Sequence, residues 1–255
     1  MSFSRSVTFR ALFLGAVATS TLMASVSMAR ADQAGDEQTI RKELAQSMAQ
    51  LPIDSVASTP IKGIYQIVSK GQIAYVTADG RYLFAGNLLD LKNQVNLTEK
   101  VRDQERVALL KTVPADHKVI FAADGAKKGT VTILTDPTCP FCEKLHREIP
   151  QLQKAGIEVQ TILTPRAGKD SPGYVESSQI MCSKDKVKGI DIAMARQPLS
   201  GDACKDSMID ANMALAEQLG MSGTPYIILP DGSAVPGYRP ASMLIPVITG
   251  QTASQ

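Results

Sequence analysis

The sequence of 255 residues contains no tryptophan, and only 5% of its residues are aromatic. The hydrophobic core must therefore be built mainly from aliphatic side chains and methionine. The chain also has little net charge. Its formal charge is +2, and removal of Arg5, Arg10 and Arg30 with an N-terminal leader would take this from +2 to near −1. Such a balance gives no indication of nucleic-acid binding.

The sequence lacks an apolar run strong enough to predict a membrane anchor. Arg5 and Arg10 precede a stretch from Ala11 to Val26 that serines and threonines interrupt, whereas a spanning helix needs about 20 strongly apolar residues. Ala29-Arg30-Ala31 then fits a small-x-small cleavage site. We predict a cleaved secretory signal peptide over residues 1–31, with retention as an anchor as the alternative.

Cysteine is scarce, but two of the four cysteines form a C-x-x-C pair, Cys139-Pro140-Phe141-Cys142. A β-branched run (130–135) precedes the pair and a segment with helical spacing follows it, which predicts a strand-to-helix junction. Free N–H groups and the helix dipole stabilise a thiolate at such a junction, above all on the N-terminal sulfur. We therefore predict Cys139 as the nucleophile and Cys142 as the thiol that resolves mixed disulfides.

Metal and haem are the other uses of a C-x-x-C pair. Glu143 follows the pair, which excludes the C-x-x-C-H motif of c-type haem. A zinc site would need His146 and either Cys182 or Cys204, and the long gap after Cys142 does not match structural zinc spacing. Zinc stays as the alternative, and we expect neither a metal nor an organic cofactor.

Cys182 and Cys204 make the number of cysteines even in a chain that we expect to be exported, which favours disulfides. Neither lies in a strand-to-helix setting, so we interpret the pair as a structural disulfide. Closing a loop of roughly 23 residues would contribute about 3 kcal/mol in the loop-entropy model. Free or metal-bound thiols are the alternative.

The mature chain is longer than one typical domain, which favours two. Its first segment, Glu37 to Leu51, places Ile40, Leu44 and Met48 on one helical face together with Leu51. Three β-prone runs (64–68, 72–77 and 82–84) follow and predict a small antiparallel sheet. This module has too little interior to be stable alone, so we expect it to pair with a second copy. Packing against the other domain of the same chain is the alternative.

A charged helix is predicted over Asn96 to Val113, with Asn96 as its cap, Glu99 at the third position and Pro114 as its end. Because most of its faces are polar, we interpret it as a solvated linker between domains.

The second domain reads as alternating strands and helices, which predicts an α/β sheet. Strands are expected at 118–121, 130–135 and 157–163, followed by a helical insertion over 171–219. We expect Pro150 to end or kink the helix of the dithiol. Gly223-Thr224-Pro225 then leads into a hairpin over 226–238.

This set of motifs resembles the thioredoxin fold and, more specifically, the bacterial periplasmic disulfide isomerases of the DsbC type and the related DsbG proteins. The resemblance covers nearly all of the mature chain. The stretches that carry it are Thr135-Asp136, Thr138-Cys139, Cys142 with Lys144-Leu145-His146, Pro165-Arg166, Cys182 and Cys204, Gly223-Thr224-Pro225, and Val235-Pro236-Gly237-Tyr238.

The resemblance implies a periplasmic homodimer with a thioredoxin-like catalytic domain that carries a helical insertion, preceded by a small α+β dimerisation domain and a linker helix. The expected bounds are 1–31 for the signal peptide, 32–95 for the dimerisation domain, 96–113 for the linker helix and 114–255 for the catalytic domain. The implied partners are misoxidised exported proteins and a membrane thiol donor of the DsbD type that keeps the dithiol reduced. No nucleic acid is implied.

The resemblance also assigns a substrate-binding role to Pro140, Phe141, Thr224 and Pro225, with a cis Thr224-Pro225 bond lying against the dithiol. Phe141 and Tyr226 are further expected either to line an apolar cleft or to pack in the core.

Two departures from the wider pattern affect the prediction of activity. Ile133 stands six residues before Cys139, where thioredoxin itself has a buried acid, and the pair Pro140-Phe141 is closer to the DsbG type than to the DsbC type. We expect isomerisation or reduction of incorrect disulfides. The alternatives are a DsbG-like reductase of protein sulfenic acids and a folding chaperone that does not need its cysteines.

Overall fold

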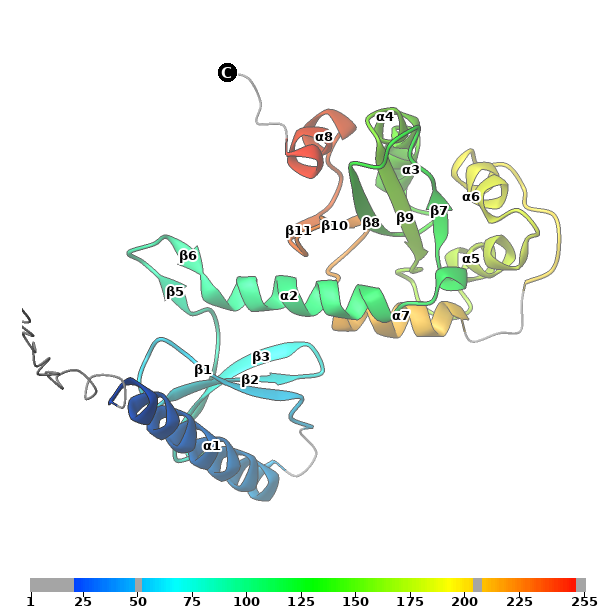
Figure 1. Cartoon of the computed structure of the whole chain (residues 1–255). Helices are drawn as coiled ribbons and strands as arrows, with labels where there is room; N and C mark the ends of the chain where they lie inside the picture. Colours follow the sequence, from blue (N-terminus) through cyan, green and yellow to red (C-terminus); the bar gives the residue numbers. More distant parts are fainter. Residues whose placement is uncertain (1–20, 49–51, 204–207, 251–255) are drawn as a thin grey trace, which may run out of the picture. The chain divides into compact units, whose positions relative to one another are not determined.

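The computed structural model describes residues 21–48, 52–203 and 208–250, and it divides into two compact units (Figure 1). The first unit comprises the described chain up to Phe84 without residues 69–73, which group with the second unit. None of the helices in the described ranges is long and apolar enough to cross a membrane. Residues 1–20 of the expected signal peptide lie outside the described residues, and its expected cleavage site lies within the first helix.

The N-terminal unit consists of one long helix and one sheet of four strands, in the order β1-β2-β3-β4. The predicted strands over 64–68 and 72–77 are found almost residue for residue, whereas β1 was not anticipated. The bounds are α1 (Thr21–Ser47), β1 (Ser55–Ser58), β2 (Ile64–Ser69), β3 (Gln72–Thr77) and β4 (Leu83–Ala85).

The core of this unit is small. Ile40 and Leu44 of α1 pack against the sheet through Tyr65, Ile67 and Val76. The prediction that Met48 shares this buried face is wrong, because α1 ends one residue earlier and the Met48 side chain is exposed. Leu51 lies outside the described residues.

The second unit contains a sheet of five strands in the order β11-β10-β8-β9-β7 (Figure 1). Strands β8 and β9 are parallel, and the other pairs are antiparallel. The bounds are β5 (Leu89–Asp90), β6 (Val95–Asn96), α2 (Leu97–Thr112), η1 (Ala115–His117), β7 (Val119–Phe121), β8 (Gly129–Thr135), α3 (Pro140–His146), α4 (Ile149–Lys154), β9 (Ile157–Leu163), α5 (Pro172–Cys182), α6 (Lys186–Met194), α7 (Met208–Gln218), β10 (Tyr226–Ile228), β11 (Ala234–Pro236) and α8 (Ala241–Thr249).

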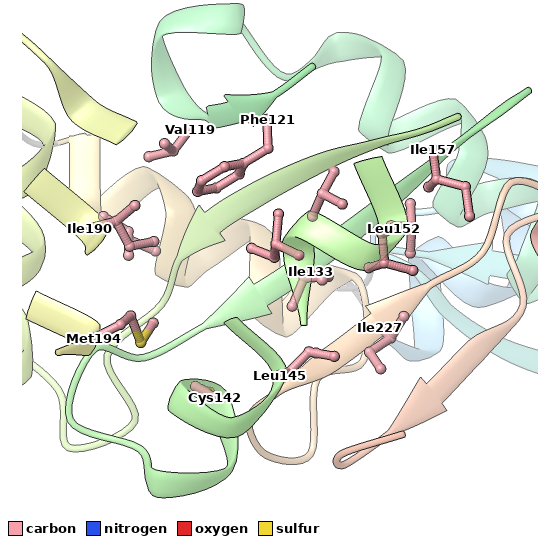
Figure 2. Packing of buried hydrophobic residues seen from close by; sticks show 14 of the residues in the cluster. Val119, Phe121, Ile133, Cys142, Leu145, Leu152, Ile157, Ile190, Met194 and Ile227 are labelled. Atoms are coloured by element: carbon pink, nitrogen blue, oxygen red, sulfur yellow. The ribbon is translucent and has the colours of Figure 1, made fainter. Parts of the chain in front are cut away.

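Alternate residues of β8 face opposite sides of this sheet, as the pleat of a strand requires. Ile133 packs with Leu145 of α3, Leu152 of α4 and Ile227 of β10 in the larger core, and Figure 2 shows Cys142 among these residues. Leu134 points to the other face, which α7 and part of α2 cover. The central strand is therefore buried on both sides, and its carboxyl end carries the dithiol.

The expectation that α2 is a solvated linker needs correction. The cap is as predicted, since the Asn96 side chain accepts a hydrogen bond from the Glu99 N–H. However, Arg106 is buried and donates to the carbonyl oxygens of Leu219 and Gly232 at 3.3 Å. A Cβ atom on Gly232 would lie 2.0 Å from the Asp103 carbonyl oxygen, so only glycine fits this close approach. Helix α2 is therefore part of the second unit's packing.

Pro150 lies in the first turn of a separate helix, α4, because the helix that follows the dithiol ends at His146 and a new one begins at Ile149. Contrary to the expectation from the sequence, Pro150 therefore neither ends nor kinks the helix of the dithiol. Proline is tolerated in the first turn of a helix because an N–H at that position would have no partner within the helix. Helix α8 was not anticipated. It begins at Ala241, whose N–H donates to Glu148.

Candidate active site

Cys139 is the N-terminal cap of α3, immediately after the loop that follows β8. Pro140 occupies the first turn, and the Glu143 N–H donates to the Cys139 carbonyl oxygen at 3.0 Å, which starts the helix. The predicted strand-to-helix junction is therefore present. Both sulfurs of the pair are free thiols.

The environment of Cys139 favours its thiolate. Burial acts to raise the pKa of this thiol, but hydrogen bonds from Thr224, from Cys142 and from the Phe141 N–H outweigh burial and lower its pKa below the ordinary value. The Cys139 Sγ lies 3.4 Å from the Thr224 carbonyl oxygen, to which the protonated thiol donates. The buried Thr224 hydroxyl has no other hydrogen-bond partner among the described residues.

Cys142 belongs to the same buried cluster as Cys139, but its pKa shifts in the opposite direction. Burial raises its pKa to about 12, although the Asp136 N–H and the Thr135 hydroxyl donate toward its sulfur. The Asp136 N–H lies 3.5 Å from Sγ. At neutral pH this thiol is therefore protonated, and it must lose its proton before it can attack a mixed disulfide at Cys139.

Asp136 holds the loop before the dithiol in place. Its Oδ1 accepts from the Thr138 N–H and hydroxyl at 2.8 and 2.6 Å, and its Oδ2 accepts from the Arg166 N–H and Nε at 3.0 and 2.9 Å. Gly173 of α5 leaves room for this carboxylate, because a Cβ atom there would lie 2.9 Å from Oδ1. One buried side chain therefore joins the ends of β8 and β9.

Asp136 does not replace the buried acid that Ile133 lacks. Burial alone would raise the pKa of Asp136, but the hydrogen bonds from Thr138 and Arg166 outweigh it and hold this pKa below its ordinary value. The carboxylate is therefore ionised and fully engaged at neutral pH. Proton transfer at Cys142 therefore falls to water or to another group.

The remaining predicted site residues divide between the surface and the core. The Thr224-Pro225 bond is cis and both residues are buried beside Cys139, whereas Pro140 is exposed and Phe141 is 62% exposed. Tyr226 packs in the core on the far face of the sheet, so its expected cleft role is not available.

His146 and Cys182 lie apart from the dithiol chemistry. Burial lowers the pKa of His146, against the effect of its partner Asp191, so this imidazole adds little positive charge at neutral pH. Cys182 is disulfide-bonded, and Cys204 lies outside the described residues. Among the described residues, no group of three or more His, Cys, Asp or Glu side chains is placed to hold a metal ion.

One residue near the site was missed by the sequence analysis. Arg196, directly after α6, donates to the Thr138 carbonyl oxygen at 3.2 Å and to both carboxylate oxygens of Glu143. No local motif marks this arginine, because the contact joins residues 53 to 58 positions apart.

Comparison with known proteins agrees with this geometry. Residues 31–99 match the family described as the disulfide bond isomerase protein N-terminal domain, and residues 116–250 match the thioredoxin-like domain. The thiol:disulfide interchange protein DsbC of Dickeya dadantii is 33% identical, with 91% of this chain and 93% of that protein covered. DsbC of Escherichia coli K12 is also 33% identical, with 86% and 89% covered.

Among solved structures, a disulfide interchange protein from Neisseria gonorrhoeae has a TM-score of 0.48 and 26% identity over 55% of this chain and 98% of its own. The two DsbC proteins match most of this chain at more than 30% identity. This chain therefore belongs to the DsbC family of thioredoxin-like thiol:disulfide interchange proteins, which are thiol-disulfide oxidoreductases.

Proposed function

We propose that this chain isomerises or reduces incorrect disulfides in exported proteins, with Cys139 as the nucleophile and Cys142 as the resolving thiol. The observation that carries the proposal is the contrast between the two thiols. Cys139 caps a helix and has a lowered pKa, whereas the pKa of Cys142 is raised to about 12 in the core. Cys139 therefore has the larger thiolate fraction of the two at any given pH, which makes it the better nucleophile.

The chemistry needs no cofactor. The Cys139 thiolate attacks one sulfur of a substrate disulfide, which forms a mixed disulfide and releases the other substrate sulfur as a thiolate. In isomerisation, a substrate thiolate then attacks the mixed disulfide, forms a new substrate disulfide and regenerates the Cys139 thiolate. In reduction, Cys142 loses its proton and attacks Cys139. The substrate then leaves with two thiols, and the Cys139–Cys142 disulfide remains.

Substrate binding is proposed beside Cys139, at Pro140, Phe141, Thr224 and Pro225. The Thr224 carbonyl oxygen lies 3.4 Å from the reactive sulfur, so an extended peptide that pairs with this backbone would bring its own disulfide to Cys139. The exposed Phe141 ring offers an apolar contact at the edge.

A second candidate reaction is the reduction of protein sulfenic acids, and the exposed Pro140-Phe141 pair favours it. Here the Cys139 thiolate would attack the sulfenic sulfur and release hydroxide, after which Cys142 would release the substrate thiol. The third candidate is a folding chaperone that does not need its cysteines, and the test must distinguish it from the two thiol reactions.

The N-terminal unit is proposed to form a homodimer. Tyr82, Leu83 and Phe84 are all exposed on or next to β4, which lies at an edge of its sheet. An edge strand with an apolar surface is suited to pairing with another strand, and the small core of this unit would gain from it. We propose 32–95 as the dimerisation domain and 114–255 as the catalytic domain, with the helix over 96–113 packed onto the catalytic domain.

The proposed location is the periplasm, after cleavage of the signal peptide over residues 1–31. The isomerase must be kept reduced there, because a disulfide between Cys139 and Cys142 leaves no thiolate to attack. We assign this task to a membrane thiol donor of the DsbD type. Cys182 is proposed to pair with Cys204, since the other two cysteines are free thiols.

The test uses the mature chain with scrambled ribonuclease. Reactivation by the wild-type chain that is lost in Cys139→Ser supports the isomerase. Activity that survives this substitution supports a chaperone and overturns the proposed chemistry. Failure on scrambled ribonuclease, together with rapid reduction of a protein sulfenic acid, would favour the second candidate.

A further inference from the structure

The helical insertion reaches the dithiol through one side chain. The Arg196 guanidinium donates from Nε to Glu143 Oε1 at 3.1 Å, and from Nη2 to Glu143 Oε2 at 3.3 Å and to the Thr138 carbonyl oxygen at 3.2 Å. Thr138 directly precedes Cys139, and Glu143 lies one helical turn after it. The arginine therefore holds both sides of the residue that carries the reactive sulfur.

Arg196 occupies a backbone position that normally favours glycine. Its φ is +58°, in the left-handed region. Its N–H donates to the Ala193 carbonyl oxygen, and the Gln197 N–H donates to that of Ile192, in the pattern that commonly ends a helix with glycine. The side chain at this position thus has a backbone cost that glycine would avoid.

Glu143 gives the arginine an electrostatic task. Glu143 is the acidic residue in the first turn of the helix that Cys139 caps, and its N–H donates to the Cys139 carbonyl oxygen. A negative charge there disfavours a thiolate. The Arg196 guanidinium is bound to both carboxylate oxygens and offsets that charge.

Other charged groups also face this region, and the test must separate them. Asp136 and Arg166 form their own ion pair beside the dithiol, and Arg166 interacts electrostatically with Cys139. Glu176 of α5 lies near both Arg196 and Asp136, and burial raises its pKa. Among these residues, Glu143 is the one bonded directly to Arg196.

We propose that Arg196 is a positioning residue for the reactive thiol, because it fixes the Thr138 carbonyl and neutralises Glu143 beside Cys139. The helical insertion thereby contributes to the reactivity of a site whose cysteines it does not contain. The inference rests on the proposed role of Cys139 as the nucleophile.

The experiment titrates the reduced, mature chain by thiolate absorbance and by the alkylation rate of Cys139. In Arg196→Gln, the pKa of Cys139 should rise by about half a unit, which means about threefold slower alkylation below the pKa. The effect is modest because Arg196 is 46% exposed and solvent screens the charge. In Arg196→Lys the pKa of Cys139 should lie between the wild-type and Arg196→Gln values, since lysine keeps the positive charge but cannot form the paired hydrogen bonds of a guanidinium.

Arg196→Gly separates positioning from stability. Glycine relieves the left-handed backbone, so the melting temperature should stay the same or rise, while the pKa of Cys139 rises as it does in Arg196→Gln. Arg147→Gln, which removes an equal charge from the exposed C-terminal end of α3, serves as the control and should leave the titration unchanged.

The double variant decides the route. If Arg196 acts through Glu143, Arg196→Gln should change the pKa of Cys139 by much less when Glu143→Gln is already present. An unchanged titration in Arg196→Gln and Arg196→Gly, or an equal shift in both backgrounds, would overturn the proposal. These titrations do not depend on isomerase activity, so a failure to reactivate ribonuclease would count against the proposed function alone.

Discussion

The two units of this protein differ most in how much interior they have. The buried hydrophobic cluster of the N-terminal unit contains five residues of the described chain, whereas the larger cluster of the second unit contains 23, including Cys139 and Cys142. The first unit also leaves Tyr82, Leu83 and Phe84 exposed. The second unit has a core large enough to bury both thiols, whereas the N-terminal unit leaves apolar side chains exposed that could bind a partner.

This difference explains why the chemistry lies where it does. Both cysteines lie in the large core of the second unit, and their pKa values differ because hydrogen bonds outweigh burial at Cys139 but not at Cys142. The N-terminal unit has no comparable interior among its described residues. Variants that affect each unit separately should therefore have different consequences.

The largest effect is expected from Cys139→Ser, which should lower disulfide exchange by at least about a thousandfold, since Cys142, the other free thiol of the described residues, has a pKa raised to about 12. Its matched variant, Cys142→Ser, should still attack substrates but accumulate mixed disulfides. Non-reducing electrophoresis separates the two outcomes. Exchange that persists in Cys139→Ser would show that Cys139 is not the nucleophile.

The next largest effect concerns pH. The pKa of Cys139 is lowered, so its thiolate should persist to a lower pH than that of a free cysteine, and its reactivity should fall only as the pH drops through this lowered value. Cys142, with a pKa of about 12, stays protonated at neutral pH. At pH 6, iodoacetamide should modify Cys139 at least about a hundredfold faster. Mass spectrometry of the labelled peptides gives the ratio, and equal labelling would contradict the assignment.

The sequence predicts these features unequally, for physical reasons. The strands at 64–68, 72–77 and 157–163 and the helix capped by Asn96 carry local signals, so their bounds are found nearly as predicted. The dithiol is equally local, because C-x-x-C, a preceding strand and a following helix suffice to place it.

What the sequence does not predict depends on contacts between distant residues. The polar pattern of α2 suggests a linker, and only the structure reveals the carbonyl groups of Leu219 and Gly232 that receive Arg106. Arg196 is missed for the same reason. Met48 has the right spacing for the buried face of α1 but lies just beyond its end.

The comparison of the units predicts a third effect, on isomerisation alone. In the full mature chain, Leu83→Lys places a charge on the edge strand β4 and should convert the proposed dimer into a monomer. Isomerase activity should fall about tenfold, because a second catalytic domain no longer holds the client at high effective concentration. Reduction by the dithiol should continue, since no residue of the second unit changes.

Sedimentation, together with parallel reductase and isomerase assays, measures the three quantities on one sample. A point variant is preferable to removal of the chain before Val113, because that truncation would strip α2 from the core it covers. A Leu83→Lys monomer with full isomerase activity would mean that dimerisation serves another purpose.

A fourth effect tests the proposed structural disulfide between Cys182 and Cys204. Replacing both Cys182 and Cys204 with Ala should lower the free energy of unfolding by about 3 kcal/mol, by the loop-entropy estimate. Alkylation of Cys139 should be almost unchanged, because the chemistry does not use this pair. Loss of exchange at unchanged stability would instead indicate a second redox pair. Chemical denaturation and the alkylation rate together decide.

The smallest effect concerns where the second unit begins. The Arg106 side chain is 9% exposed and donates hydrogen bonds to the carbonyl oxygens of Leu219 and Gly232. Arg102 lies four residues earlier on the same helix. Its side chain is 33% exposed, and its ion pair is with Glu99. Arg106→Met should lower the free energy of unfolding by about 2 kcal/mol, because two carbonyl groups lose a buried donor.

Arg102→Met is the matched control. It removes one arginine from the same helix, but its ion pair is partly exposed and should be worth less than about 1 kcal/mol. If α2 were the solvated linker that its composition suggests, the two variants would be equally harmless in denaturant titrations. A clear difference between them would instead place the boundary between the units before Leu97, so that α2 unfolds together with the domain that carries the dithiol.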